Sequence, residues 1–299
     1  MNSDTTSPPA TAFRAAAGLN LLTWPALDAS GADAAVTARS GGVSAGPYAT
    51  LNLSLTVGDD PGCVLENRRR LAAAFGAAPG DFVFARQVHG ADVRVVGEAD
   101  RGRGALRLDD AIGSASEAGR AGGVASAGGA DALVTASPGV VLAILTADCV
   151  PIVLHDPVAG VLACVHAGWR GTVAGVTAAA VAAMRGLGTR PSDILAGIGP
   201  AVGADRYQVG PDVHEAVSRS FGPAAPEFIR PDPSAPGRWL LDLPSANGHA
   251  LREAGVPGPR IHAVGIPTGP APGHFFSDRA ARPCGRLALV ARLRPGGEP

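Results

Sequence analysis

The sequence predicts a single globular domain that contains both helices and strands. Of its 299 residues, 46% are hydrophobic and 17% are charged, a composition typical of a packed domain rather than of a disordered chain. Almost uninterrupted apolar runs within 140–169 are typical of buried strands. In contrast, segment 61–75 places apolar residues at helical spacing, and 173–184 is an alanine-rich run typical of a helix.

The N-terminal part of the chain begins with a low-complexity stretch. Residues 1–17 are rich in Ser, Thr, Pro and Ala and predict a disordered leader, so that the folded domain is expected over 18–299. This stretch has no basic region followed by an apolar run, and we expect no secretory signal. Pro61 suits a first helical position, and a helix is predicted over 61–75.

A second low-complexity stretch runs from about residue 98 to residue 129 and is rich in Gly, Ala and Ser. Apolar, strand-like runs resume on both sides of it. We therefore predict a mobile surface insertion here, rather than a boundary between domains.

The second half of the chain alternates strands and helices. Three buried strands are predicted within 140–169, and Gly-Trp-Arg-Gly-Thr then leads into the helix over 173–184. Further predicted elements are a strand over 194–198, a helix over 211–221 and a closing strand over 287–293. The apolar runs end well short of a bilayer span, which predicts no membrane segment and, with four cysteines too few for a disulfide scaffold, a cytoplasmic protein.

His89, Cys149 and His166 lie at the ends of short apolar runs, where strands gather functional side chains. One thiolate and two imidazoles can hold zinc and leave a fourth position open, the pattern of a catalytic site. The alternatives are a cysteine buried as a small hydrophobic residue, a core histidine at 166 and a solvent-facing histidine at 89. Asp148 is a candidate proton carrier or support for the metal ligand, or a carboxylate that only stabilises a turn.

All 25 basic side chains are arginines, which excludes a Schiff-base lysine and a P-loop lysine. The formal net charge of −1 gives no electrostatic footprint for extended nucleic-acid binding. Arg39 and Arg170 stand beside glycine turns, and Arg68 follows Asn67, so these side chains are candidates for binding phosphate or carboxylate. The first amides of the helix that follows Arg170 offer a further place for an anion.

Several motifs together resemble the YfiH-type laccase-domain family, which is described both as polyphenol oxidoreductase and as purine nucleoside phosphorylase. The resemblance runs from about residue 38 to residue 293. It rests on Arg-Ser-Gly-Gly-Val-Ser (39–44), Gln-Val-His-Gly (87–90), Asp-Ala-Leu-Val-Thr (131–135), Thr-Ala-Asp-Cys (146–149), His-Ala-Gly-Trp-Arg-Gly (166–171), Gly-Ile-Gly-Pro (197–200) and Phe-Phe-Ser (275–277).

The resemblance implies an α+β fold, a four-layer α/β/β/α sandwich with mixed sheets. It implies a zinc ion on His89, Cys149 and His166, with copper as the alternative metal. It also implies phosphorolysis of adenosine, inosine and S-methyl-5′-thioadenosine, together with adenosine deamination. The substrate and phosphate contacts expected on this basis are Arg39, Ser40, Asn67, Arg68, Gln87 and Arg170.

The chain departs from the family pattern in three places that bear on substrate preference. Arg206, Tyr207 and Gln208 stand where the family has a Cys-Tyr-Glu-like turn. Pro267 and Thr268 replace Cys-Thr, and Ser-Asp-Arg-Ala-Ala-Arg (277–282) replaces Ser-Tyr-Arg-Arg. None of these departures touches the expected metal ligands.

Three other functions remain open from the residues. A copper oxidase would use the same two histidines and cysteine, although only five further histidines are available for a trinuclear cluster. A thiol hydrolase would use Cys149 as nucleophile with a histidine as base. A non-enzymatic binding protein would show no turnover on any nucleoside.

Overall fold

The structure, a computed structural model, describes residues 11–114, 128–269 and 273–295. The first sheet contains β1 (Ala12–Ala16), β2 (Leu19–Thr23), β3 (Ala32–Thr37), β4 (Phe82–Phe84), β7 (Val141–Thr146) and β17 (Leu287–Leu293). The second sheet contains β5 (Val93–Val95), β6 (Ala132–Thr135), β8 (Val150–Asp156), β9 (Val161–Ala167), β10 (Leu195–Ile198) and β15 (Ile261–Ala263).

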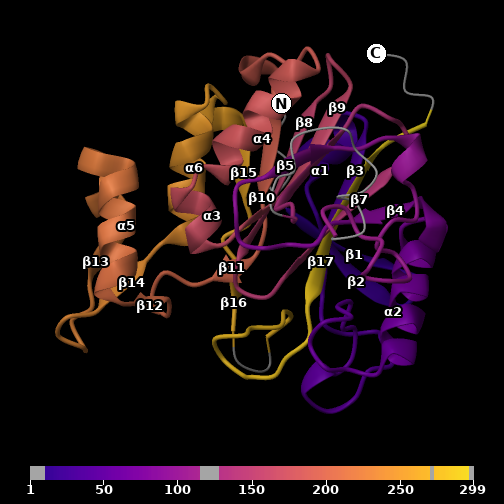
Figure 1. Ribbon diagram of the computed structural model, residues 1–299, viewed down its shortest axis with the longest axis horizontal. Helices are drawn as coiled ribbons and strands as arrows, with labels where there is room; N and C mark the ends of the chain where they lie inside the picture. The colour runs from indigo at the N-terminus through magenta and orange to yellow at the C-terminus, as the bar shows by residue number, and fades with distance from the viewer. Residues whose placement is uncertain (1–10, 115–127, 270–272, 296–299) are drawn as a thin grey trace, which may run out of the picture.

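Both sheets are mixed. The first has the order β1-β2-β3-β17-β7-β4 and the second the order β15-β10-β8-β9-β6-β5 (Figure 1). Neighbouring strands run antiparallel in most of each sheet, but β4 runs parallel to β7, β5 to β6 and β10 to β15. Adjacent strands β8 and β9 form an antiparallel pair in which Pro151 lies opposite His166.

The two sheets pack face to face, and helices cover their outer faces. Between the sheets, Leu142 and Leu289 of the first sheet share a core with Val153 and Leu162 of the second. Helix α2 (Pro61–Ala74) covers the outer face of the first sheet. Helices α4 (Val176–Gly186) and α6 (Leu243–Glu253) cover the outer face of the second. This arrangement confirms the predicted four-layer α+β fold.

The remaining elements lie around this sandwich. They are the helices α1 (Pro25–Ala29), α3 (Trp169–Val173) and α5 (Pro211–Phe221) and the short strands β11 (Ala201–Val202), β12 (Gln208–Val209), β13 (Ile229–Pro231), β14 (Trp239–Leu241) and β16 (Pro267–Thr268). Helix α5 and the small sheet β12-β14-β13 stand together at one side of the molecule (Figure 1). Within the described residues, no helix is long and apolar enough to cross a bilayer.

Most predicted elements are present with nearly the predicted bounds, as α2, β7, β8, β9, β10, α5 and β17 show. The helix predicted over 173–184 differs. Helix α3 ends at Val173, and α4 begins at Val176, because Gly175 has a left-handed backbone with φ of 82° that interrupts the helix.

The prediction of a disordered leader over 1–17 is wrong for the last residues of that segment. Ala12–Ala16 forms β1, which pairs with β2. The turn between them uses Ala17 and Gly18, with φ of 46° and 80°, and positive φ at both central residues suits a two-residue hairpin. Residues 1–10 lie outside the described part of the chain.

The insertion predicted over 98–129 is also partly wrong. Ala105, Ala111 and Ile112 are buried, and Ile112 forms a β-bridge with Ala85. The first half of the segment therefore packs on the sandwich because it contributes apolar residues to the core. Residues 115–127 lie outside the described part of the chain.

Candidate metal centre and its arginine-lined pocket

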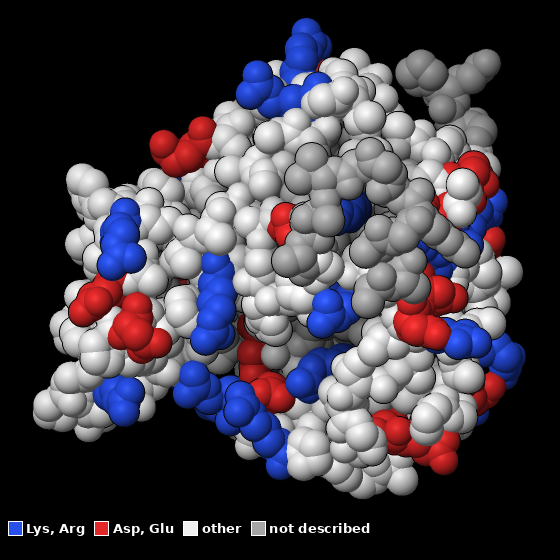
Figure 2. All heavy atoms as spheres, in the orientation of Figure 1, with Lys and Arg blue, Asp and Glu red and all other residues white. Residues whose placement is uncertain are grey.

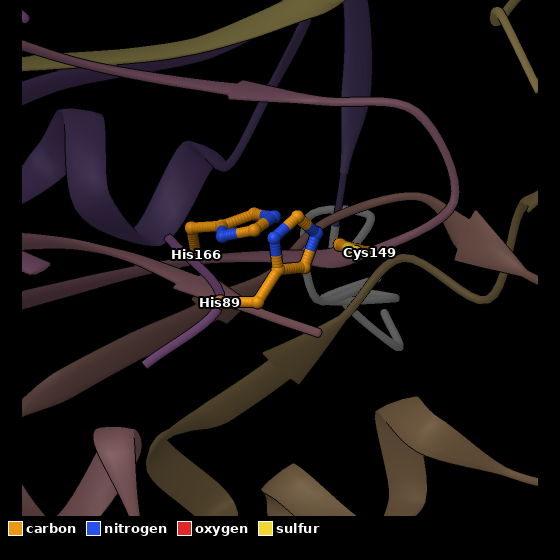
Figure 3. A group of neighbouring side chains, drawn as sticks. All are labelled: His89, Cys149 and His166. Carbon is orange, nitrogen blue, oxygen red and sulfur yellow. The ribbon is translucent and has the colours of Figure 1, made fainter. Parts of the chain in front are cut away.

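Three side chains from two separate parts of the chain meet at one end of the second sheet (Figure 3). Cys149 directly precedes β8 and His166 lies in β9, so the antiparallel pairing brings them to the same end of the sheet. His89 arrives from the loop between β4 and β5, where its backbone is left-handed with φ of 60°. One ligand atom of each residue lies within 4.8 Å of the others.

This group fits a tetrahedral metal ion. Zinc bonds of about 2.0–2.3 Å to nitrogen and sulfur place tetrahedral ligands roughly 3.3–3.8 Å apart, so the three atoms need only a small adjustment. His166 is 3% exposed, Cys149 is partly buried and His89 is exposed. The group is therefore anchored on its His166 side and accessible on its His89 side.

Asp131, which immediately precedes β6, organises two of the three ligands. Its buried carboxylate lies 2.7 Å from Nδ1 of His166 and accepts hydrogen bonds from the backbone amides of Val88, His89 and Gly90 at 3.1, 3.0 and 2.7 Å. With Nδ1 held by the carboxylate, Nε2 of His166 is left as the metal-binding nitrogen. The same carboxylate fixes the strained loop that presents His89.

Glycines allow the loop after β9 to lie against this group. A Cβ atom on Gly168 would lie 2.9 Å from Cδ2 of His89 and 3.0 Å from the Cys149 sulfur, and one on Gly171 would lie 2.7 Å from the carbonyl oxygen of Gly90. Both positions thus need glycine because ligands or backbone approach too closely for a side chain.

The charges within the group favour the thiolate form of Cys149. Burial alone would raise the pKa of Cys149, but the His166 and His89 imidazoles outweigh burial and lower it. Burial alone would lower the pKa of His166, but the Cys149 thiolate and Asp131 outweigh burial and raise it. The sulfur is therefore held as a thiolate, the form that binds metals.

The group opens into a pocket of about 880 Å³. Among the described residues, six arginines line it: Arg68, Arg86, Arg170, Arg279, Arg282 and Arg286. In the described part of the chain, two carboxylates, Asp148 and Asp278, line the same pocket. Figure 2 shows basic side chains around the rim of a hollow and acidic side chains inside it. The excess of positive charge makes the pocket suitable for an anion.

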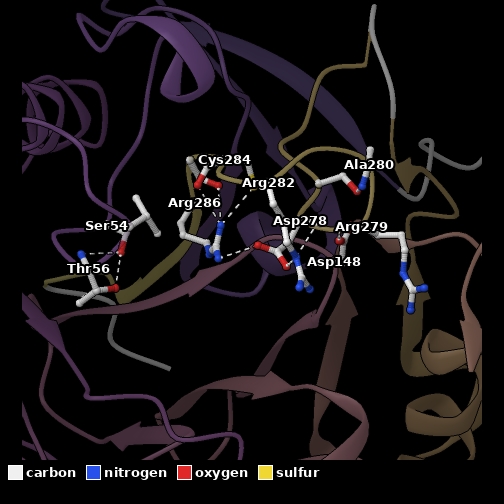
Figure 4. A network of polar contacts seen from close by, with 12 residues as sticks. Ser54, Thr56, Asp148, Asp278, Arg279, Ala280, Arg282, Cys284 and Arg286 are labelled. Atoms are coloured by element: carbon white, nitrogen blue, oxygen red, sulfur yellow. Dashed lines mark hydrogen bonds and ion pairs between the residues drawn. The ribbon is translucent and has the colours of Figure 1, made fainter. Parts of the chain in front are cut away.

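Asp148 connects the metal ligands to the arginine-bearing segment. It has a left-handed backbone with φ of 84°. One carboxylate oxygen accepts the Thr268 hydroxyl, and the other accepts the Arg279 amide at 2.6 Å (Figure 4). Both oxygens are thus used in positioning β16 and the segment around Arg279, which favours the structural alternative for Asp148 over the proton carrier.

Asp278 pairs with two of the three arginines that follow it in the same segment. Its carboxylate forms ion pairs with Arg282 at 2.5 Å and with Arg286 at 3.0 Å (Figure 4). These two guanidiniums therefore share one carboxylate, which offsets part of their combined positive charge.

Three of the predicted substrate contacts do line the pocket. Arg170 is exposed there, with its guanidinium carbon 4.4 Å from the centre of the Trp169 ring. Arg68 is 6% exposed and donates to carbonyl oxygens, and burial lowers its pKa to about 10, so it stays cationic at neutral pH. The Gln87 amide pairs with the backbone of Leu145 in both directions at 2.7 Å, which holds the His89 loop on β7.

The other three predicted contacts do not line the pocket, and the sequence prediction is corrected for Arg39, Ser40 and Asn67. Arg39 donates Nε and Nη2 to the Ala49 carbonyl at 3.1 and 2.9 Å and lies over Phe276. Asn67 is fully buried and fastens the loop after Arg39 through bonds to backbone and side-chain atoms. The glycine turn beside Arg39 therefore did not predict where its guanidinium lies.

The sequence analysis assigned no individual role to several residues that the structure brings to the site, although it placed some of them in segments that bear on substrate preference: Asp131, Tyr207, Asp278, Arg279, Arg282, Arg286 and Arg86. The Asp-Ala-Leu-Val-Thr motif and the closing segment after Phe-Phe-Ser contained most of them. Their position in those motifs could have indicated that they belong to the site, but their individual roles depend on tertiary contacts.

Comparison with known proteins agrees with this architecture. The family model for multi-copper polyphenol oxidoreductase laccase matches residues 33–294. Purine nucleoside phosphorylase YlmD of Geobacillus stearothermophilus is 39% identical over 268 residues, covering 88% of this chain and 90% of that protein. A purine nucleoside phosphorylase of Deinococcus radiodurans is 45% identical over 241 residues, covering 81% of each.

The fold is also shared with a solved structure. The crystal structure of hypothetical protein YfiH from Bacillus licheniformis matches with a TM-score of 0.84 at 31% identity, covering 94% of this chain and 99% of that chain. The chain therefore belongs to the multi-copper polyphenol oxidoreductase laccase family, the YfiH-type family that its motifs resemble.

Proposed function

We propose that the protein is a purine nucleoside phosphorylase that holds zinc on His89, Cys149 and His166. The observation that carries this proposal is the position of the metal-ligand group in the wall of an arginine-rich pocket. A volume of about 880 Å³ lies within the range of small-molecule sites and accommodates a nucleoside together with phosphate. The names of the relatives support the same activity.

The residues divide the work of this reaction. The guanidiniums of the pocket attract phosphate and hold it beside the nucleoside, which makes the attack effectively unimolecular. Their fixed charges also stabilise the negative charge that moves onto the departing purine. Bound zinc supplies Lewis-acid stabilisation of developing negative charge and can activate water. Asp131 keeps His166 and the His89 loop in place during turnover.

We propose adenosine, inosine and S-methyl-5′-thioadenosine as substrates, with adenosine deamination as a second activity. Deamination needs activated water near C6 of adenine, and the accessible His89 side of the metal-ligand group gives a place for it. The free thiol of Cys149 suits a reducing compartment, which supports a cytoplasmic location.

The decisive experiment measures purine release and inosine formation from adenosine, with and without phosphate, on protein of known metal content. Cys149→Ala removes a proposed ligand, and Cys63→Ala, on α2 away from the pocket, is the matched control. Phosphate-dependent adenine release that disappears together with zinc in Cys149→Ala, but persists in Cys63→Ala, supports the proposal. Fully zinc-loaded protein that forms neither product refutes it and favours a binding protein.

A thiol hydrolase is a second candidate because Cys149, His166 and Asp131 lie in the order nucleophile, base and orienting carboxylate. Site-resolved labelling with iodoacetamide separates the two functions. A zinc-bound Cys149 is protected while metal is present, whereas a nucleophilic Cys149 reacts and activity is lost. The labelling of Cys63 serves as the internal reference.

Copper is the alternative metal, and metal analysis of the purified protein decides between the two. A trinuclear copper cluster does not fit the described residues. All seven histidines of the chain are described, and only His89 and His166 line the pocket. A single copper ion on the same three ligands remains compatible with the site.

A further inference from the structure

Tyr207 carries a hydroxyl group without a partner in the pocket wall. It lies between β11 and β12, where its amide donates to the Gly203 carbonyl at 3.0 Å and its carbonyl accepts from Leu241 at 3.1 Å. These bonds fix the backbone. Within residues 11–114, 128–269 and 273–295, no hydrogen-bond partner reaches its phenol oxygen. A positioned and half-buried donor that is left unused suggests a ligand.

Two guanidiniums accompany this phenol. The guanidinium carbon of Arg279 lies 5.2 Å from the centre of the Tyr207 ring, and its Nη2 donates to the Gln208 carbonyl at 3.0 Å. Arg170 lies over Trp169. Tyr207, Arg279 and Arg170 line the same pocket as the metal-ligand group, and the charges of Cys149, Arg279, Asp148 and Arg170 all act on the Tyr207 phenol.

These two arginines differ from Arg282 and Arg286, which share the Asp278 carboxylate. Arg68 and Arg86 donate to backbone carbonyl oxygens elsewhere in the pocket wall. Among the described residues, no carboxylate forms an ion pair with Arg170 or with Arg279. Figure 4 shows the Arg279 side chain on the other side of Asp148 from Arg286. The Tyr207 side of the pocket therefore carries two guanidiniums that no carboxylate of the described residues pairs with.

We propose that Tyr207, Arg170 and Arg279 form the subsite for a phosphate oxyanion beside the metal-ligand group. The role of that phosphate as co-substrate rests on the proposed phosphorylase function. Two guanidiniums can bind phosphate oxygens through paired N–H donors, and the phenol adds an O–H donor. Stacking on Trp169 and Tyr207 restricts the two guanidiniums before phosphate arrives, which reduces the entropy lost on binding.

In phosphorolysis, an oxygen of HPO₄²⁻ at this subsite bonds to C1′ of the nucleoside as the bond from C1′ to N9 breaks. The electron pair of the broken bond leaves with the purine. The proton that phosphate gives up balances the proton that the purine takes up, so the products are a pentose 1-phosphate and the neutral base. Tyr207 donates a hydrogen bond throughout and does not change its protonation state.

The test measures binding of inorganic phosphate to zinc-loaded protein by isothermal titration calorimetry, without nucleoside. The variants are Tyr207→Phe, Arg170→Gln and Arg279→Gln. Arg206→Gln is the matched control, because Arg206 is the exposed neighbour of Tyr207 and lies outside the pocket lining. A lost hydrogen bond to a charged ligand predicts phosphate binding weakened about 10-fold to 100-fold in the three variants. Binding to Arg206→Gln is expected to equal that of the wild type.

Equal phosphate affinity in wild type and all three variants overturns the subsite, as does wild-type protein that binds no phosphate. Steady-state kinetics add an independent readout, in which Tyr207→Phe raises KM for phosphate and leaves KM for nucleoside unchanged. The opposite pattern assigns Tyr207 to the nucleoside and overturns the proposal. If phosphate binding depends on the three residues but no phosphorolysis occurs, the subsite stands and the proposed function fails.

Discussion

The Asp131 carboxylate lies 2.7 Å from Nδ1 of His166 and also accepts a hydrogen bond from the backbone amide of His89 at 3.0 Å, so one side chain positions two proposed metal ligands. Asp131→Asn replaces one accepting oxygen by an NH₂ group that faces donors. We expect zinc affinity to fall about 10-fold to 100-fold, measured by competition with a chromophoric chelator. Asp242→Asn, at the start of α6, is the control and should leave zinc affinity unchanged. Unaltered affinity in Asp131→Asn would show that the carboxylate does not support the ligands.

Gly168→Ala introduces a Cβ atom at 2.9 Å from His89 and 3.0 Å from the Cys149 sulfur. One of the two ligands must move, so we expect the variant to fold but to lose most of its bound zinc, as measured by elemental analysis and circular dichroism. Gly186→Ala is the control, because no atom lies within 4 Å of the added carbon. Full zinc occupancy in Gly168→Ala would contradict the proposed ligand set.

Asp148→Asn distinguishes positioning from proton transfer. An asparagine keeps one accepting oxygen for the Arg279 amide, and its NH₂ group can donate to the Thr268 hydroxyl oxygen. We therefore expect kcat to fall about tenfold or less, compared with about 10²–10⁴-fold for loss of a general acid or base. The measurement is the pH profile of kcat/KM. Loss of one limb of that profile would restore Asp148 as the proton carrier.

His155 makes the stability of the fold depend on pH. Burial lowers its pKa to about 4, against a smaller opposing effect of Asp156, and Nδ1 lies 2.9 Å from the Ser30 hydroxyl. Between pH 6.5 and 4 the unfolded chain takes up a proton at this residue while the folded chain does not. The free energy of unfolding therefore falls as pH falls through this window, by up to about 3 kcal/mol from this group.

Urea unfolding of wild type and His155→Gln at pH 7 and pH 4.5 checks this expectation. The difference between the two pH values should shrink in the variant. His262→Gln, on β15 of the same sheet, is the control. An equal loss of stability at low pH in wild type and His155→Gln would assign the effect to other groups.

The sequence was informative where local pattern and tertiary position coincide. Cys149 and His166 end apolar runs that become adjacent strands, so their meeting follows from strand pairing. The closing strand β17 was predictable because it is apolar on both faces, and it lies buried between other strands of the first sheet.

Other features depend on contacts that no local pattern encodes. Ala12–Ala16 lacks strong strand-forming residues except Phe13, and β2 provides its order through the hairpin. Arg39 stands beside the same kind of glycine turn as Arg170, yet its guanidinium binds the Ala49 carbonyl. The roles of Asp131 and Tyr207 arise from partners more than 30 residues away in sequence, such as His166 for Asp131.

The loop that carries His89 leaves β4 in the first sheet and enters β5 in the second, and Cys149 lies in the connection from β7 of the first sheet to β8 of the second, whereas His166 belongs to β9 of the second sheet. An ion held by all three ligands is therefore a cross-link between the layers. Separation of the sheets would pull His89 from the ion, and departure of the ion would remove one fastening between the sheets. Removal of the ion by a chelator is therefore expected to lower the free energy of unfolding of the whole sandwich.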